Sequence, residues 1–294
     1  MRRSRTTPRG ILVPLAAALA AVSVATPALG SGSAETAVPK IVFPLVAKTV
    51  WWDNYGDPRP NGRHAGIDIM APWRSPVVAV EPGRVKYWDA GLGGCMLYLY
   101  GRSGTMYMYI HLNNDVTARN DNRGRCHEVA YAVPDGAKVA AGEQIAWSGD
   151  SGDANGNPHL HFEVHPDGGA DVNPFPYLSR AARPLFAAKL GTPFSLGLRG
   201  QLDAVGGGVL ALTVDRVRHY PGGRWLEIDK RVVQLEIPPD AEVAPGLAGA
   251  SQLAVKQLKQ PIAVTVHTAK ARTTTEAMLG VAGALTASRL LPAR

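Results

Sequence analysis

The stretch His159–Glu163, with the sequence HLHFE, constrains the fold more than any other part of the chain. Polar and apolar residues alternate along it, which is typical of a half-buried β-strand. Successive side chains of a strand point to opposite faces, so we expect His159, His161 and Glu163 to share one face. Two imidazoles and a carboxylate in a row suit a metal ion, although a polar face open to water would show the same pattern.

Short strand-like runs separated by turn signals precede this stretch. Such a rhythm, with a turn every 8 to 12 residues, is typical of an antiparallel β fold. In the predicted strand 105–111, alternation places Tyr107, Tyr109 and His111 on one face. The predicted strands cover residues 41–46, 67–70, 77–80, 84–88, 95–100, 105–111, 138–141 and 144–148.

The N-terminus has the three-part pattern of a secretory signal. Four arginines lie within residues 1–9, an apolar run follows over 11–24, and small residues stand at Ala28 and Gly30. We therefore expect residues 1–30 to be a signal peptide, followed by a flexible lead-in over 31–40. An uncleaved anchor is the alternative, but the run is shorter than the roughly 20 residues of a membrane span.

Charge and cysteine content fit an exported protein. The chain has 294 residues and a net charge of +7, which favours an anionic partner. Export argues against nucleic acid and leaves an acidic polymer or membrane surface. The two cysteines, Cys95 and Cys126, are expected to form a disulfide in an oxidising compartment. A metal site that uses Cys126 and His127 is the alternative.

The sequence changes character after residue 180. We predict a linker over 181–195, a small antiparallel β domain over 196–270, and a tail over 271–294. The alternating runs suit a barrel of the OB type or a sandwich, although no motif specifies either. Binding of a polymer and a purely structural role both stay open for this domain.

Four motifs occur in a fixed order along the first half of the chain. They are HxGxD at 64–68, YxHL at 109–112, a Gly-rich loop at 149–158 and HLHFE at 159–163. Together with VNP at 172–174, this order resembles the lysostaphin/LytM-type zinc endopeptidases. The resemblance covers about residues 40 to 178, and it implies a mainly β, antiparallel metallopeptidase domain over 41–180.

The resemblance implies a role for each of five residues. His64, Asp68 and His161 would hold Zn²⁺ and leave one tetrahedral position for water, as a catalytic zinc requires. His111 and His159 would be catalytic. We assign His159 as the general base and His111 as its partner, and the reverse assignment stays open.

Some residues near these motifs have no role in the family pattern. We expect Glu163 to orient a histidine, and Tyr55 and Tyr109 either to donate to an oxyanion or simply to pack. The other histidines are expected to be surface or structural residues, and they are His127, His165, His219 and His267.

The resemblance also implies an activity. The chain would be a secreted, cell-wall-associated zinc endopeptidase that hydrolyses peptide cross-links of peptidoglycan, and we expect it to be monomeric, without a permanent membrane span and without a nucleic-acid partner. Anionic cell-wall polymers are a further expected partner. The alternatives are a non-catalytic zinc-binding regulator and a cell-wall-binding protein. Which peptide bond is cut, and whether the leading segment is inhibitory, does not follow from the sequence.

Overall fold

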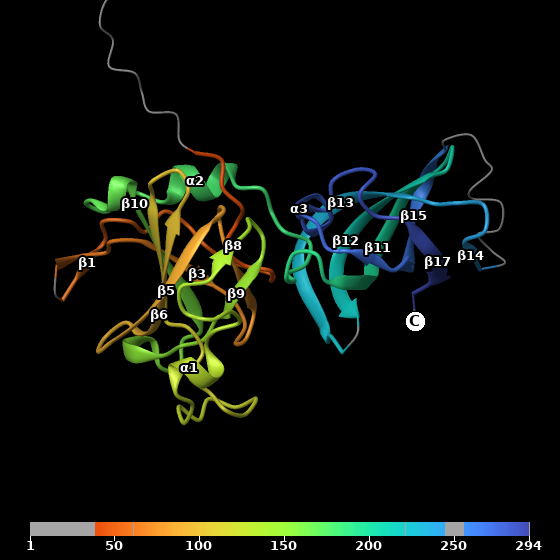
Figure 1. The fold of residues 1–294 in the computed structure, drawn as a ribbon. Helices are drawn as coiled ribbons and strands as arrows, with labels where there is room; N and C mark the ends of the chain where they lie inside the picture. Colours follow the sequence, from red (N-terminus) through yellow and green to blue (C-terminus); the bar gives the residue numbers. More distant parts are fainter. Residues whose placement is uncertain (1–38, 61, 221, 245–255, 294) are drawn as a thin grey trace, which may run out of the picture. The chain divides into compact units, whose positions relative to one another are not determined.

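The computed structural model describes residues 39–60, 62–220, 222–244 and 256–293. The predicted signal peptide at 1–30 and nearly all of the predicted lead-in lie outside these ranges. The described part is mostly antiparallel β-structure, which confirms the predicted fold class (Figure 1). None of its helices combines the length and the apolar character that a membrane crossing needs.

The first half of the described chain is built around one six-stranded antiparallel sheet. Its strand order is β3-β10-β7-β6-β5-β8, and a β4-β9 pair and a β1-β2 hairpin lie outside it. The strands are β1 (Pro58–Arg59), β2 (Gly62–Arg63), β3 (Ile67–Met70), β4 (Pro76–Val78), β5 (Gly83–Ala90), β6 (Gly94–Gly101), β7 (Met106–Ile110), β8 (Lys138–Val139), β9 (Gln144–Trp147) and β10 (His159–His165). Short helices α1 (Cys126–Val129) and α2 (Phe175–Arg180) and two 3₁₀ turns complete this half.

Strand β10 lies between β3 and β7, and this position gathers residues that are far apart in the sequence. Its His161 is directly opposite Asp68 of β3 on one side and Ile110 of β7 on the other. The alternate residues Leu160, Phe162 and Val164 are fully buried in the core. One face of β10 therefore packs against the interior, and the other carries the histidines.

The N-terminal segment departs from the prediction. Residues 41–46 form only isolated bridges, from Val42 to Ala182 and from Leu45 to Val77, in place of a continuous strand. Their side chains are nevertheless buried. The predicted strand is not continuous, because the backbone hydrogen bonds of this run go to two different segments, residues 76–80 and Ala182.

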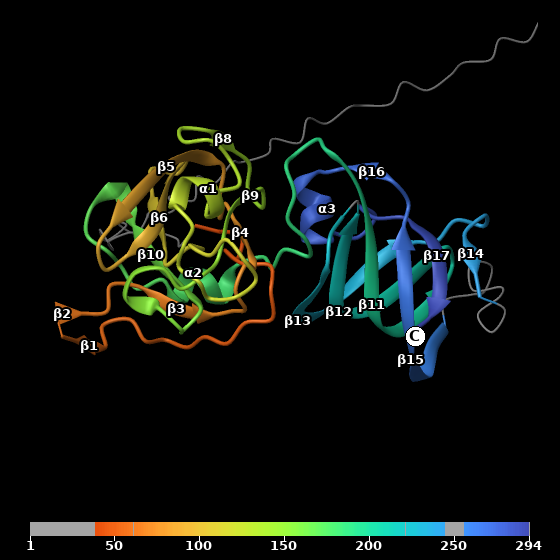
Figure 2. The same cartoon turned by 90° about the horizontal axis from the view of Figure 1, so that it is seen from below.

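The second half forms a seven-stranded sheet (Figure 2). Its order is β13-β12-β11-β15-β17-β14, and β16 pairs with one end of β11. The strands are β11 (Pro193–Gly206), β12 (Val209–Tyr220), β13 (Trp225–Glu236), β14 (Glu242–Val243), β15 (Lys256–Thr268), β16 (Ala271–Arg272) and β17 (Ala287–Pro292), with helix α3 (Thr275–Leu279) before the last strand. This confirms a second antiparallel β region.

Its boundaries differ from the predicted ones. The expected linker at 181–195 contains Leu185, Phe186 and Phe194, which are buried in the second core, and β11 already begins at Pro193. The expected tail at 271–294 supplies α3 and β17, and β17 pairs with β15. Both segments are rich in small residues, and their large apolar side chains pack against the core. Residues 245–255 of the predicted β domain lie outside the described residues.

The loop between β7 and β8 is tied to the sheet by a disulfide. Cys126 of α1 is bonded to Cys95 of β6, which confirms the predicted pairing. The bond closes a stretch with a sequence separation of 31 residues. This long loop contains little regular structure, and the disulfide keeps it close to β6.

We expect the double substitution Cys95→Ser with Cys126→Ser to lower the free energy of unfolding by about 3–4 kcal/mol, because the unfolded chain regains the entropy of this loop. Urea unfolding of both proteins measures the difference. As a matched control, the unfolding of the wild-type protein is also compared with and without a reductant. The reductant removes the same bond as the double substitution, so the two losses of stability should agree. A loss below about 1 kcal/mol would contradict the entropic role.

Candidate metal centre

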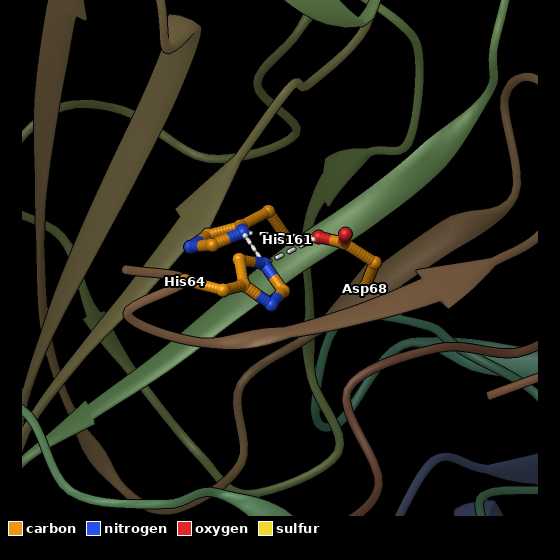
Figure 3. Close-up of side chains that lie close together, drawn as sticks. All are labelled: His64, Asp68 and His161. Carbon is orange, nitrogen blue, oxygen red and sulfur yellow. Dashed lines mark hydrogen bonds and ion pairs between the residues drawn. The ribbon is translucent and has the colours of Figure 1, made fainter. Parts of the chain in front are cut away.

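Three side chains from two motifs meet beside the paired strands β3 and β10 (Figure 3). His64 Nε2 lies 2.9 Å from His161 Nδ1 and 3.0 Å from Asp68 Oδ1. His161 Nδ1 and Asp68 Oδ1 are also 3.0 Å apart. The three atoms form a nearly equilateral triangle, and no fourth His, Cys, Asp or Glu in the described part of the chain joins this group.

Local backbone geometry makes this close approach feasible. Gly66 stands between His64 and β3, and a Cβ added there would lie 2.5 Å from the carbonyl oxygen of Phe162 and 2.8 Å from His161 Nε2. Only glycine leaves room for β10 beside this turn. The glycine of the HxGxD motif therefore sets the distance between two of the three side chains.

The two imidazoles are held in tautomers that direct lone pairs at the triangle. His64 Nδ1 lies 2.7 Å from the backbone carbonyl oxygen of Asn54. A carbonyl oxygen can only accept a hydrogen bond, so Nδ1 is the donor. His161 Nε2 lies 2.9 Å from Glu163 Oε1 and donates to that carboxylate. The facing atoms, His64 Nε2 and His161 Nδ1, are thus unprotonated in the neutral rings.

A cation resolves the repulsion that this arrangement would otherwise create. Three lone-pair atoms within about 3 Å of one another cannot hydrogen-bond among themselves without added positive charge. Burial lowers the pKa of His161, but hydrogen bonds to Asp68 and Glu163 outweigh it and raise the pKa to about 9. The site therefore attracts positive charge. A proton can bridge only one pair of these atoms, whereas a divalent ion can be bound by all three. Two imidazoles and a carboxylate are ligands that Zn²⁺ accepts.

The second oxygen of Asp68 is held away from the triangle. Asp68 Oδ2 accepts hydrogen bonds from Arg59 Nη2 at 2.8 Å and from Asn54 Nδ2 at 3.3 Å. Burial raises the pKa of Asp68, but hydrogen bonds to His161 and His64 hold it well below its usual range. Asp68 thus remains a carboxylate with one oxygen free for a metal.

Glu163 connects His161 to a further histidine. Its Oε2 accepts from His165 Nε2 at 2.7 Å, and His165 Nδ1 donates to the carbonyl of Gly169 at 2.9 Å. Burial raises the pKa of Glu163, but its two histidine partners lower it to about 2. A carboxylate that accepts from the far nitrogen of a ligating histidine fixes its ring orientation and raises its basicity.

His111 and His159 lie beside the triangle with their rings 4.8 Å apart. Each ring is anchored through Nδ1 to a backbone carbonyl, His111 to Ser151 at 2.8 Å and His159 to Asn157 at 2.8 Å. His159 Nε2 lies 3.6 Å from Asp68 Oδ1. Burial, and then the charge of His159, lower the pKa of His111 to about 4, so this ring is neutral at pH 7 and its Nε2 can accept a hydrogen bond.

The backbone at His111 departs from the predicted alternation. Tyr109 is fully buried, and its hydroxyl accepts from the Val80 amide at 3.1 Å, so it points into the core. If the backbone of His111 were extended, its ring would point into the core on the same face as Tyr109. Instead His111 has φ of +60°, which turns its ring to the side of the triangle. The prediction that His111 shares a face with Tyr107 and Tyr109 was wrong, because a left-handed residue interrupts the period of two.

The structure places all five sequence-predicted site residues in one cluster. It also adds residues that the sequence reasoning missed: Asn54, Arg59 and the carboxylate-bound His165. His165 continues the row 159, 161, 163, so strict alternation could have revealed it. Tyr55 donates to Asp171 Oδ2 at 2.9 Å, so its hydroxyl is engaged in the loop structure.

The donor set could hold a metal ion and leave one coordination position open. It offers three N and O ligands with two further imidazoles beside them, whereas a structural zinc site closes its shell with four protein ligands. Residues 62–174 match the family model described as Peptidase family M23. The family match contains all five clustered residues.

Individual proteins with similar sequences include the uncharacterized lipoprotein YgeR of Escherichia coli K12. It is 30% identical over 150 residues, which are 49% of this chain and 53% of YgeR, so the chain spans about half of that relative. The catalytic domain of lysostaphin from Staphylococcus simulans is 26% identical over 48% of this chain and 92% of that domain, with a TM-score of 0.31. A zinc-containing peptidase from Vibrio cholerae is 23% identical over 45% and 39% of the two chains, with a TM-score of 0.35.

We expect His111→Gly to be more stable than His111→Ala by about 1 kcal/mol, because the left-handed backbone penalises every Cβ but not glycine. The two variants lose the same imidazole, so their difference isolates the backbone strain. Denaturant unfolding measures it. Equal stability, or a more stable alanine variant, would show that the left-handed conformation is not maintained in solution.

Proposed function

We propose that the protein is a zinc metallo-endopeptidase that hydrolyses peptide bonds of bacterial cell-wall peptidoglycan. The observation that carries this proposal is the triangle of His64 Nε2, Asp68 Oδ1 and His161 Nδ1, with edges of 2.9 to 3.0 Å. The match of residues 62–174 to the model of Peptidase family M23 supports the reaction class. His64, Asp68 and His161 are the proposed ligands.

The chain's own residues account for the proton transfers. Zn²⁺ bound at the triangle supplies a Lewis acid and a water of lowered pKa. His159 and His111 have free Nε2 atoms because their Nδ1 atoms are bound to backbone carbonyls. We assign His159, the closer to Asp68, to remove a proton from the attacking water and deliver it to the leaving amine. His111 is assigned to orient the reacting groups beside it.

The proposed setting is the bacterial envelope or the surrounding medium. The pattern of residues 1–30 predicts export, and the net charge of +7 suits a wall that carries anionic polymers. A disulfide between Cys95 and Cys126 is consistent with an oxidising compartment. We propose that the protein acts there as a monomer on peptide cross-links.

Metal removal should abolish hydrolysis reversibly. We expect a chelator to stop the release of peptides from purified peptidoglycan, and one equivalent of zinc to restore it, because the triangle has no other source of positive charge for all three atoms. His64→Ala should lose both the bound zinc and the activity. Mass spectrometry of the digest and metal analysis measure the two effects, and undiminished hydrolysis by metal-free protein would contradict the mechanism.

His159→Ala should separate catalysis from metal binding. We expect it to retain zinc while kcat/KM falls by about 10²- to 10⁴-fold, because a general base is lost and no ligand is removed. His127→Ala is the matched control, since that side chain is 63% exposed and lies outside the cluster. If the wild-type protein binds zinc but releases no peptide from peptidoglycan, a non-catalytic, zinc-binding regulator replaces the enzyme.

A further inference from the structure

One face of the second sheet carries a row of cationic and aromatic side chains. Trp225, Arg218, Gly197, His267 and Arg289 are directly opposite one another on β13, β12, β11, β15 and β17. Adjacent strands are about 4.8 Å apart, so the row is continuous across five strands. The neighbouring residues in each strand point the other way into the core, and they include Leu196, Leu198, Val217, Val266 and Leu290.

Two arginine–aromatic pairs lie over the glycine of this row. The Arg199 guanidinium is 4.4 Å from the centroid of Trp225, and that of Arg218 is 4.8 Å from the centroid of Tyr220. A Cβ on Gly197 would meet Trp225 at 2.9 Å and Tyr220 at 3.4 Å. Glycine thus lets both rings lie against the backbone, and the rings hold the guanidinium groups in place. We call the set of Gly197, Arg199, Arg218, Tyr220, Trp225, His267 and Arg289 the open face.

The positive charge on the open face is only partly compensated. Arg199 makes no salt bridge to any described residue, and its buried Nε has no hydrogen-bond partner. Arg289 contacts Glu242 at 2.8 Å, at the outer edge of the sheet. Burial, and then the charges of Arg289 and Arg218, lower the pKa of His267, whereas the charge of Glu242 raises it. An anion placed among these cationic groups would relieve their mutual repulsion.

Two hollows lie on this face. One of about 470 Å³ is lined by Arg199, Thr265, His267 and Arg289 among others. A second of about 490 Å³ is lined by Ser195, Tyr220 and Lys270 together with Pro193 and Phe194. The rings of Tyr220 and His267, one from each hollow, are 6.1 Å apart. An extended chain with a repeating unit can occupy both hollows, whereas a compact ion fills only one.

We propose that the open face binds a polymer of sugar or polyol units joined by phosphodiesters. Arg199, His267 and Arg289 come from three strands around one hollow, which suits an anion whose oxygens point in several directions. A carboxylate, by contrast, can form both of its hydrogen bonds with a single arginine guanidinium group. Hydroxyl groups of the sugar or polyol find Ser195, Thr265 and Lys270 in the two hollows.

Single-stranded nucleic acid is the competing polyanion. It binds by stacking successive bases on free aromatic faces. On the open face one side of each ring already carries an arginine, on Trp225 and on Tyr220, so no series of free rings remains. The observations therefore favour a phosphate polymer without bases.

The experiment measures binding of the full chain to poly(glycerol phosphate) by titration calorimetry at two salt concentrations. We expect Arg199→Gln and Arg289→Gln each to weaken binding about ten-fold, because each removes a charge-assisted hydrogen bond. Each should also lower the slope of log K against log salt by about 1. Arg102 is an exposed arginine in the turn between β6 and β7, so Arg102→Gln removes the same charge and should change affinity less than two-fold. Thermal melts verify that the variants fold.

Three results would overturn the proposal. The first is that Arg102→Gln weakens polymer binding as much as Arg199→Gln and Arg289→Gln do, which would show that binding depends on net charge alone. The second is binding of polygalacturonate as tight as that of the phosphate polymer. The third is tighter binding of an oligo-dT of equal charge, which would reassign the open face to nucleic acid. This experiment measures polymer binding and not hydrolysis. A negative binding result therefore does not contradict the proposed hydrolysis, and a protein without hydrolytic activity can still bind the polymer.

Discussion

The candidate metal centre depends on the convergence of three atoms that can coordinate a cation, His64 Nε2, Asp68 Oδ1 and His161 Nδ1, within 3.0 Å of one another. Each is held there by a hydrogen bond on its far side, to the Asn54 carbonyl, to Arg59 and to Glu163. These outer contacts fix the tautomers and direct the lone pairs inward. The folded protein therefore prepares a site whose electrostatic repulsion only added positive charge can relieve.

The sheet supplies the framework for this convergence. Strand β10 brings His161 opposite Asp68 through backbone pairing, and its buried alternate residues fix the register, since a one-residue slip would turn the histidines into the core. His111 reaches the cluster only through a left-handed backbone, with hydrogen bonds from its own amide to Gly93 and from Gly149 to its carbonyl. Local strain of this kind persists where the surrounding structure holds it and is found at functional sites.

The sequence was informative where a short-range rule decides the structure. Alternation placed His161 and Phe162 on opposite faces of β10, and the strand at 67–70 was predicted with its observed bounds. The turned ring of His111 was missed because a positive φ outside glycine leaves no local signal. The partners Arg59 and Asn54 could not be identified, since long-range pairing brings them to Asp68. The predicted linker and tail failed for the same reason: Phe194 and Leu290 are anchored by a core that forms from distant strands.

Diffraction data collected at the zinc absorption edge, from crystals of the zinc-loaded protein, test the central claim most directly. The claim predicts one anomalous peak in the first sheet, bonded to His64 Nε2, Asp68 Oδ1 and His161 Nδ1, with the remaining position open to solvent. A peak elsewhere, a fourth protein ligand in that position, or bonding through the opposite nitrogen of either histidine would contradict it.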